Sequence, residues 1–146
     1  YEKYIDLPRK TYLYFSFTNI YFFSKHFKLT NKFLNRIIIS RNNKEADTSL
    51  IALAMVIQVV TMLESQDTLL FKNKLNSTRK YIKQESVSDW LLQFCDFLSL
   101  YEKNKWGKNK LEKEIKNKLI KESAADKALK KLFGYFDLVK WLEKRM

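Results

Sequence analysis

The longest apolar stretch of the chain runs from Leu50 to Leu63 and carries only two polar side chains, Gln58 and Thr61. A helix that is apolar around its whole circumference must be enclosed on every side. A membrane span needs about 20 apolar residues, so a run of this length is more typical of a buried core helix. The pattern therefore predicts a central helix from about Ala46 to Leu63, with the other helices packed around it and no membrane contact.

Apolar residues recur at helical spacing on both sides of this stretch. A break at 40–43 and a loop at 103–109 interrupt the pattern, and Ser123 with Asp126 reads as a capping box that starts the last helix. Gly134 is expected to loosen that helix without ending it. Besides the central helix, the pattern predicts helices at 11–26, 29–38, 68–83, 87–101, 110–121 and from 123 towards the C-terminus.

The first of these segments has two possible readings. Residues between Tyr12 and Thr18 alternate and are rich in strand formers. Its length favours a helix, because strands usually stop at about eight residues. In that helix Leu13, Phe17, Ile20, Tyr21 and Ser24 share one face.

These elements predict an all-α fold of about seven helices. Helices joined by short turns pack antiparallel, so we expect three hairpins and a closing helix. Two glycines and one proline argue against a sandwich or barrel of short strands. Residues 1–146 are expected to form a single domain. The chain begins with Tyr1 and shows no signal peptide, which predicts the C-terminal part of a longer protein, with the cytoplasm as the default location.

Large residues of the first hairpin stand where a tetratricopeptide repeat of about 34 residues places its packing side chains. They are Tyr14, Phe17, Tyr21, Phe27, Leu34 and Ile37. The segment resembles that repeat, although Lys25 replaces its usual glycine, Thr30 replaces an alanine and no proline closes the unit. Weaker copies lie at 59–83 and 88–121, and 135–145 resembles a capping end. The resemblance implies a short right-handed superhelix of helical hairpins.

Residue types that most catalytic or metal sites need are scarce. His26 is the only histidine and Cys95 the only cysteine, so neither a zinc site nor a Ser-His-Asp or Cys-His triad is expected. Gly107 and Gly134 cannot build a phosphate-binding loop. We therefore expect no enzyme activity, cofactor, metal or small-molecule substrate. The apolar neighbours of Cys95 predict a buried, unreactive thiol.

Aromatic residues near the start outnumber what one helix face can bury. They are Tyr12, Tyr14, Phe15, Phe22 and Phe23. Two interpretations stay open: these rings pack on residues outside the sequence, or they line a peptide groove, as the first helices of such repeats do. The second predicts a non-catalytic interaction or scaffolding module that binds a protein, a peptide or further repeats of its own chain. Its partner-binding residues would be Tyr12, Phe15, Asn19 and Phe22.

The net charge of +12 suggests a polyanion as an alternative partner. Only 5 of the 28 basic residues are arginine, the residue preferred for phosphate and base contacts. The densest basic run is interleaved with glutamates, which favours a solvated helix face over a nucleic-acid patch. Nucleic-acid binding through a lysine-rich surface is thus the alternative to protein docking. The run consists of Lys103, Lys105, Lys108, Lys110, Lys113, Lys116, Lys118 and Lys121.

Overall fold

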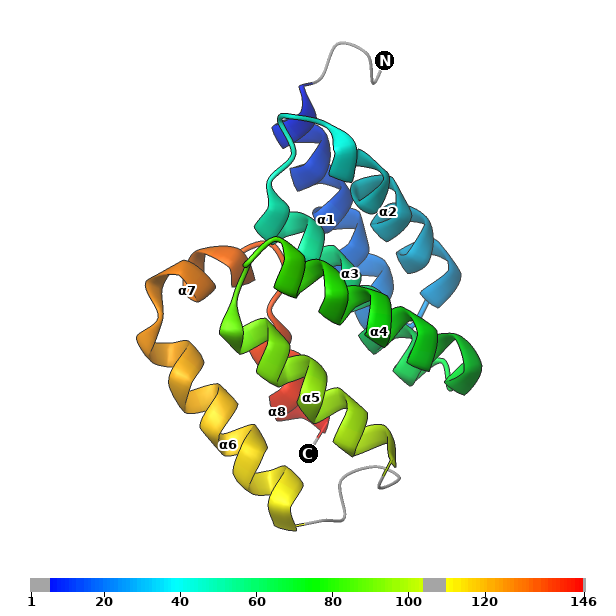
Figure 1. Ribbon diagram of the computed structural model, residues 1–146. Coiled ribbons are helices and arrows are strands. Elements are labelled where there is room, and N and C mark those ends of the chain that lie inside the picture. The colour runs from blue at the N-terminus through cyan, green and yellow to red at the C-terminus, as the bar shows by residue number, and fades with distance from the viewer. Residues whose placement is uncertain (1–5, 104–109, 146) are drawn as a thin grey trace.

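The computed structural model describes residues 6–103 and 110–145, except for the side chains of Lys110, Leu111 and Arg145. Within these ranges the chain forms eight α-helices and one 3-10 turn (Ser40–Asn42), with no strand, which confirms the all-α prediction (Figure 1). Most of the predicted 103–109 loop, with Lys105 and Lys108, lies outside the described residues. The helices are α1 (Leu7–Phe23), α2 (Phe27–Ile39), α3 (Thr48–Glu64), α4 (Thr68–Gln84), α5 (Asp89–Lys103), α6 (Lys110–Ala125), α7 (Lys127–Phe133) and α8 (Leu138–Arg145).

Helix α3 is the centre of the core, as its apolar sequence predicts. Every residue from Ile51 to Thr61 is buried. The Asp47 carboxylate starts the helix by accepting hydrogen bonds from the backbone N–H groups of Ser49 and Leu50. Helices α2, α4, α5 and α7 all contact α3 (Figure 1). Protein therefore encloses the stretch that the sequence marks as entirely apolar.

Several buried polar side chains form hydrogen bonds within their own helix. The hydroxyls of Thr18, Thr61 and Thr78 each donate to the carbonyl oxygen four residues earlier, at 2.7 to 2.8 Å. Between helices, the Gln58 amide in α3 donates to Oδ1 of Asn35 in α2 at 2.7 Å. These bonds lower the cost of placing polar side chains inside an apolar core, although Oε1 of Gln58 is buried without a hydrogen-bond partner.

The α1–α2, α3–α4 and α4–α5 turns share one backbone structure. Lys25, Gln66 and Ser86 have positive φ angles of 64°, 61° and 50°. In each turn this residue donates its N–H to the carbonyl three residues earlier, and the next residue donates to the carbonyl five residues earlier. This is the Schellman arrangement, which satisfies carbonyl groups left open at the end of a helix.

The C-terminal part differs from the prediction. Gly134 does end a helix: its N–H donates to the Lys131 carbonyl, and α8 starts anew with Asp137 accepting from the Lys140 N–H at 3.1 Å. The predicted capping box is also wrong, because α6 continues to Ala125 and the Ser123 hydroxyl donates back to Ile120. Asp126 alone caps α7. The single closing helix is therefore two short helices.

Helix α8 packs into the body of the molecule, behind α5 in the view of Figure 1. Its residues Leu138, Trp141 and Leu142 are buried. The Trp141 ring lies edge-on to Phe94 of α5, with centroids 6.1 Å apart. Its indole N–H donates to the Glu64 carboxylate at the end of α3, at 2.7 Å. The C-terminal helix thus contacts both α5 and the end of α3.

Candidate interaction surface on the first two helices

Helix α1 is apolar on two opposite faces, and the molecule covers only one of them. Thr11, Phe15, Thr18 and Phe22 form the buried face. The residues at positions 13, 17 and 20 fall one turn apart on the other side. Their exposed fractions are 40% for Leu13, 40% for Phe17 and 62% for Ile20. The face on which the sequence places these three residues therefore points to solvent.

Helix α2 extends this apolar surface through Phe33. The Phe33 ring lies 5.0 Å from the Phe17 ring and stacks parallel on Tyr21 at 5.7 Å. Leu29, one turn earlier, is 38% exposed. We name Leu13, Phe17, Ile20, Leu29 and Phe33 together the α1/α2 face. A contiguous exposed apolar surface of this kind is typical of an interaction site, whereas single exposed apolar residues are not.

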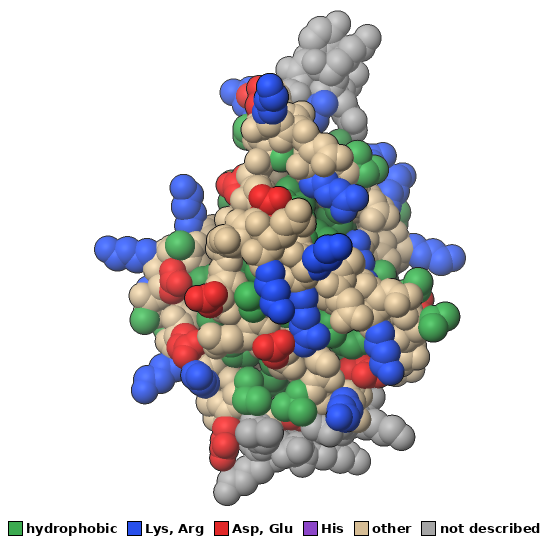
Figure 2. All heavy atoms as spheres, in the orientation of Figure 1, with side chains coloured by type: hydrophobic (Ala, Val, Ile, Leu, Met, Phe, Trp, Pro, Cys, Tyr) green, Lys and Arg blue, Asp and Glu red, His purple; other side chains and the backbone are tan. Residues whose placement is uncertain are grey.

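Every formal charge in residues 7–44, the segment that forms α1 and α2, is positive. No aspartate or glutamate occurs between Asp6 and Glu45, whereas this segment carries eight basic residues. Figure 2 shows basic side chains projecting at the edge of the molecule that α2 forms. The guanidinium of Arg36 lies over the rings of Tyr14 and Phe33, at 5.7 and 5.4 Å from their centroids. The eight are Arg9, Lys10, Lys25, Lys28, Lys32, Arg36, Arg41 and Lys44.

The sequence places Leu13, Phe17 and Ile20 on one face of a helix, but it does not show that this face is exposed. The alternation of apolar residues on both sides of α1 predicts a surplus of apolar side chains, but not which side the rest of the chain covers. The densest lysine run also carries glutamates, whereas the longer segment of residues 7–44 has the same number of basic residues, eight, and no acidic residue. The absence of acidic residues from an apolar segment is the signal that could have identified Leu13, Ile20 and Lys32.

The four residues predicted to bind a partner lie together on the other side of α1, against the chain's own segment between α7 and α8. Tyr12 is 60% exposed, whereas Phe15 and Phe22 are 1% and 4% exposed. The Phe15 ring packs on Tyr135 with centroids 5.5 Å apart. The Asn19 amide donates to the Tyr135 carbonyl at 2.7 Å.

The same segment covers the end of that face, where the Phe22 ring lies edge-on to Phe136 at 5.3 Å. The structure therefore brings the four predicted residues together, but it places the chain's own residues on two of them. Phe15 and Phe22 can reach a partner only after Tyr135 and Phe136 move away. Their partner-binding role stays a prediction.

A cavity of about 360 Å³ opens beside Phe22 and Phe23, with Trp141 and Glu64 among its lining residues. The ammonium groups of Lys140 and Lys144 lie 5.1 and 5.2 Å from the centroid of the Phe23 ring. Glu64 is engaged with the Trp141 indole. The cavity is therefore lined largely by aromatic rings, and Lys25, Glu64 and Lys144 are its charged lining residues.

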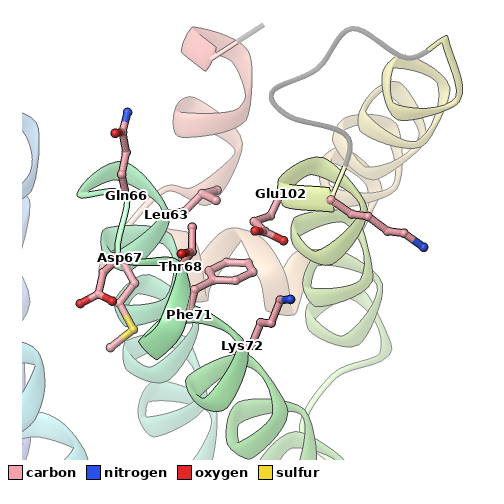
Figure 3. A pocket seen from close by; sticks show the side chains of 9 residues that line it. Leu63, Gln66, Asp67, Thr68, Phe71, Lys72 and Glu102 are labelled. Atoms are coloured by element: carbon pink, nitrogen blue, oxygen red, sulfur yellow. The ribbon is translucent and has the colours of Figure 1, made fainter.

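A second cavity, of about 390 Å³, lies where the α3–α4 turn meets the end of α5 (Figure 3). Phe71 faces into it, and Lys72 of α4 and Glu102 of α5 lie on either side. A third, of about 520 Å³, lies among the starts of α3, α5 and α7. The carboxylates of Asp47 and Asp126 that border it are already bonded to the backbone of their own helices.

Cys95 and His26 are the chain's only cysteine and histidine, and they lie in different surroundings. Burial raises the pKa of the Cys95 thiol from 9.0 to about 12, and Arg79 and Asp96 act on it in opposite directions. The thiol is therefore protonated near neutral pH, and the protonated form is a poor nucleophile. Nδ1 of the exposed His26 lies 3.0 Å from the Ser24 hydroxyl in the α1–α2 turn. No group of three potential metal ligands occurs among the described residues.

Comparison with known proteins adds no further assignment. No protein-family model matches the chain, and no curated protein or solved structure is significantly similar to it. None of the described helices is both long enough and apolar enough to cross a bilayer.

Proposed function

We propose that the chain is a non-catalytic protein-interaction module, built of tetratricopeptide-like helical hairpins that stack into a short superhelix. It docks a protein partner, or further repeats of its own chain, on the α1/α2 face. The observation that carries this proposal is the exposed stripe of Leu13, Phe17 and Ile20. The shared backbone structure of three successive turns supports the repeat part of the proposal.

Burial of this stripe supplies a driving force for docking. Moving a leucine, isoleucine or phenylalanine side chain from full exposure to full burial contributes about 1.5 to 3 kcal/mol. These side chains are partly covered already, so each has only a fraction of that to gain. Apolar residues repeated at helical spacing on one surface are nevertheless the anchors that helix-in-groove docking buries. A bound partner would remove from water the apolar part of α1 that the rest of the chain leaves exposed.

Site-specific photo-cross-linking in the native cell tests the proposal. A photoreactive amino acid at Ile20 of the full chain is expected to capture a protein, whereas the same amino acid at Leu69, an exposed leucine of α4, is not. The captured protein, once purified, should bind the wild type about tenfold more tightly than Leu13→Gln. Equal capture at both positions, or none at Ile20, would reject the proposal.

Nucleic-acid binding remains the alternative, and the net charge of +12 favours it. In Figure 2, Lys and Arg side chains spread over the visible face with Asp and Glu between them. Counterion release predicts an affinity that falls steeply with salt. A mobility-shift assay with duplex and single-stranded probes near physiological salt tests it, and absence of binding there removes this alternative.

A further inference from the structure

We infer that the partner of the α1/α2 face is an acidic amphipathic helix. Its apolar stripe would lie on Leu13, Phe17 and Ile20, and its carboxylates would face the bases at the rim. This inference rests on the proposed function, since it names the chemistry of the partner that docks there.

The stripe has the spacing that helix-on-helix packing uses. Residues 13, 17 and 20 follow one another at intervals of four and three, so they form a ridge about 10 Å long. Phe33 packs against the side of this ridge, at 5.0 Å from the Phe17 ring, and Leu29 lies one turn away. A ridge with an apolar shoulder accepts a second helix whose own apolar residues recur every three to four positions.

The rim of the face carries bases at successive helical turns. On α2, Lys28, Lys32 and Arg36 are exposed and separated by four residues each. Lys10 stands three residues before Leu13, at the start of the stripe. Because like charges at this spacing destabilise a helix, the arrangement favours neighbours that bring carboxylates. Exposed pairs of this kind add little affinity each, but together they set specificity and accelerate association.

Other occupants fit less well. A second copy of the chain would bring the same acid-free basic segment, and like charges would repel each other. Nucleic acid would satisfy the bases but has no use for exposed leucine and isoleucine, which cannot stack on bases as aromatic rings do. A bilayer would have to take in Arg36, whose guanidinium lies over the rings of Tyr14 and Phe33 at the level of the apolar surface.

A selection from a displayed library of helical peptides tests this inference directly. The wild-type protein is the target, and the double variant Leu13→Gln/Ile20→Gln removes peptides that bind elsewhere. A matched double variant, Leu69→Gln/Leu70→Gln, changes two exposed leucines of α4 and leaves the α1/α2 face intact. Enriched peptides are expected to have apolar residues every three to four positions and a net negative charge. Both double variants are checked for a native circular dichroism spectrum and melting temperature.

Affinities of the enriched peptides then test the role of charge. Lys32→Glu is expected to weaken binding about tenfold, and the matched change Lys130→Glu on α7 is expected to have no effect. Raising the salt should weaken binding to the wild type more than binding to Lys32→Glu. Enriched peptides that are neutral or basic, or that bind both double variants equally, overturn the inference.

Two further probes separate this inference from its rivals. If vesicles of phosphatidylcholine with phosphatidylserine, or a DNA duplex, bind the wild type and lose binding in Leu13→Gln/Ile20→Gln, the face belongs to a membrane or to nucleic acid, and the inference is wrong. If the cross-linker at Ile20 captures a protein while the selected peptides are not acidic, the inference fails and the proposed function stands.

Discussion

At the scale of single residues, the buried thiol shows how much local surroundings decide. Cys95 lies among apolar residues of α5, and its sequence neighbours alone predict a buried and unreactive side chain, which the structure confirms. Desolvation disfavours the thiolate and is the largest cause of its raised pKa. The nearby Arg79 guanidinium does not compensate, because it is itself bonded to Asp96 at 2.8 Å.

This raised pKa predicts a loss of stability in alkali. The folded-state pKa of about 12 lies above the ordinary 9.0, so at high pH the unfolded chain releases the thiol proton while the folded chain keeps it. The contribution is complete below pH 9 and is lost as the pH rises towards 12. At pH of about 10.5 it should have cost the protein about 2 kcal/mol of its free energy of unfolding.

Urea unfolding of the wild type and of Cys95→Ala measures this loss. The difference in unfolding free energy between the two proteins should change between neutral pH and pH of about 10.5, in favour of the variant at high pH. Tyr81, whose pKa is also raised by burial, is present in both proteins and cancels. A difference that stays constant with pH would show that Cys95 ionises in the folded state as it does in the unfolded state.

At the scale of elements, the turns contain strain that glycine can relieve. Gln66 adopts the left-handed conformation at φ 61°, which costs a residue with a Cβ about 1 to 2 kcal/mol. Gln66→Gly is expected to raise the unfolding free energy by about 0.5 kcal/mol, because glycine's larger chain entropy in the unfolded state offsets part of the relief. Thermal and urea unfolding measure the change.

Ser65, the preceding residue, is the matched control. Its φ of −84° suits any residue, so Ser65→Gly gains no relief and should lower the unfolding free energy by about 0.5 to 1 kcal/mol. Changes of the same sign in the two variants would show that the turn is not strained at Gln66. Lys25 and Ser86 hold the same position in the other two turns and should respond alike.

Helix positions were predictable from the sequence because hydrophobic periodicity is a local signal. The apolar stripes of α3 and α5 are complete within one segment, and both helices lie where the pattern predicts them. The break at Gly134 was not predictable in this way. It depends on Tyr135 and Phe136 packing against α1, more than a hundred residues earlier in the chain. The covered side of α1 escaped prediction for the same reason.

At the scale of the whole molecule, the segment between α7 and α8 ties the C-terminus to α1. Asn19 donates to both the Phe15 and the Tyr135 carbonyl oxygens, at 2.9 and 2.7 Å. Asn19→Ala removes both bonds, including the one that holds the segment between α7 and α8, and is expected to cost about 1 kcal/mol. If the segment opens locally, amide exchange of α8 should accelerate about fivefold, whereas exchange in α4 should not.

Hydrogen exchange followed by mass spectrometry measures this difference. Asn35→Ala, which removes the Gln58 partner between α2 and α3, is the comparison variant. It should not accelerate exchange in α8 selectively. Equal acceleration of α4 and α8 in Asn19→Ala would mean that the C-terminal helices open only with the whole core. Phe15 and Phe22 would then stay covered as long as the protein is folded.

The basic residues beside the α1/α2 face should destabilise the folded state by repelling one another, while they serve binding of an acidic partner. Lys32 stands four residues from both Lys28 and Arg36, so Lys32→Glu replaces two like-charge pairs with two opposite-charge pairs. The change should stabilise the protein by roughly 1 kcal/mol at low salt and raise its melting temperature by about 2 to 4 °C. The gain should shrink as salt shortens the Debye length from about 30 Å at 10 mM to about 10 Å at 100 mM.

Circular dichroism melts of Lys32→Glu and Lys130→Glu at both salt concentrations measure these changes in melting temperature. The comparison separates a lysine that serves a partner from a lysine that only adds to the net charge. Lys130 follows Asp126 by four residues, so reversing its charge should lower the melting temperature. A lysine whose reversal both raises stability and weakens peptide binding is retained at a cost to the fold, which selection accepts at functional sites. If Lys32→Glu instead leaves stability unchanged at low salt, the bases of α2 do not repel one another, and their link to an acidic partner loses its physical basis.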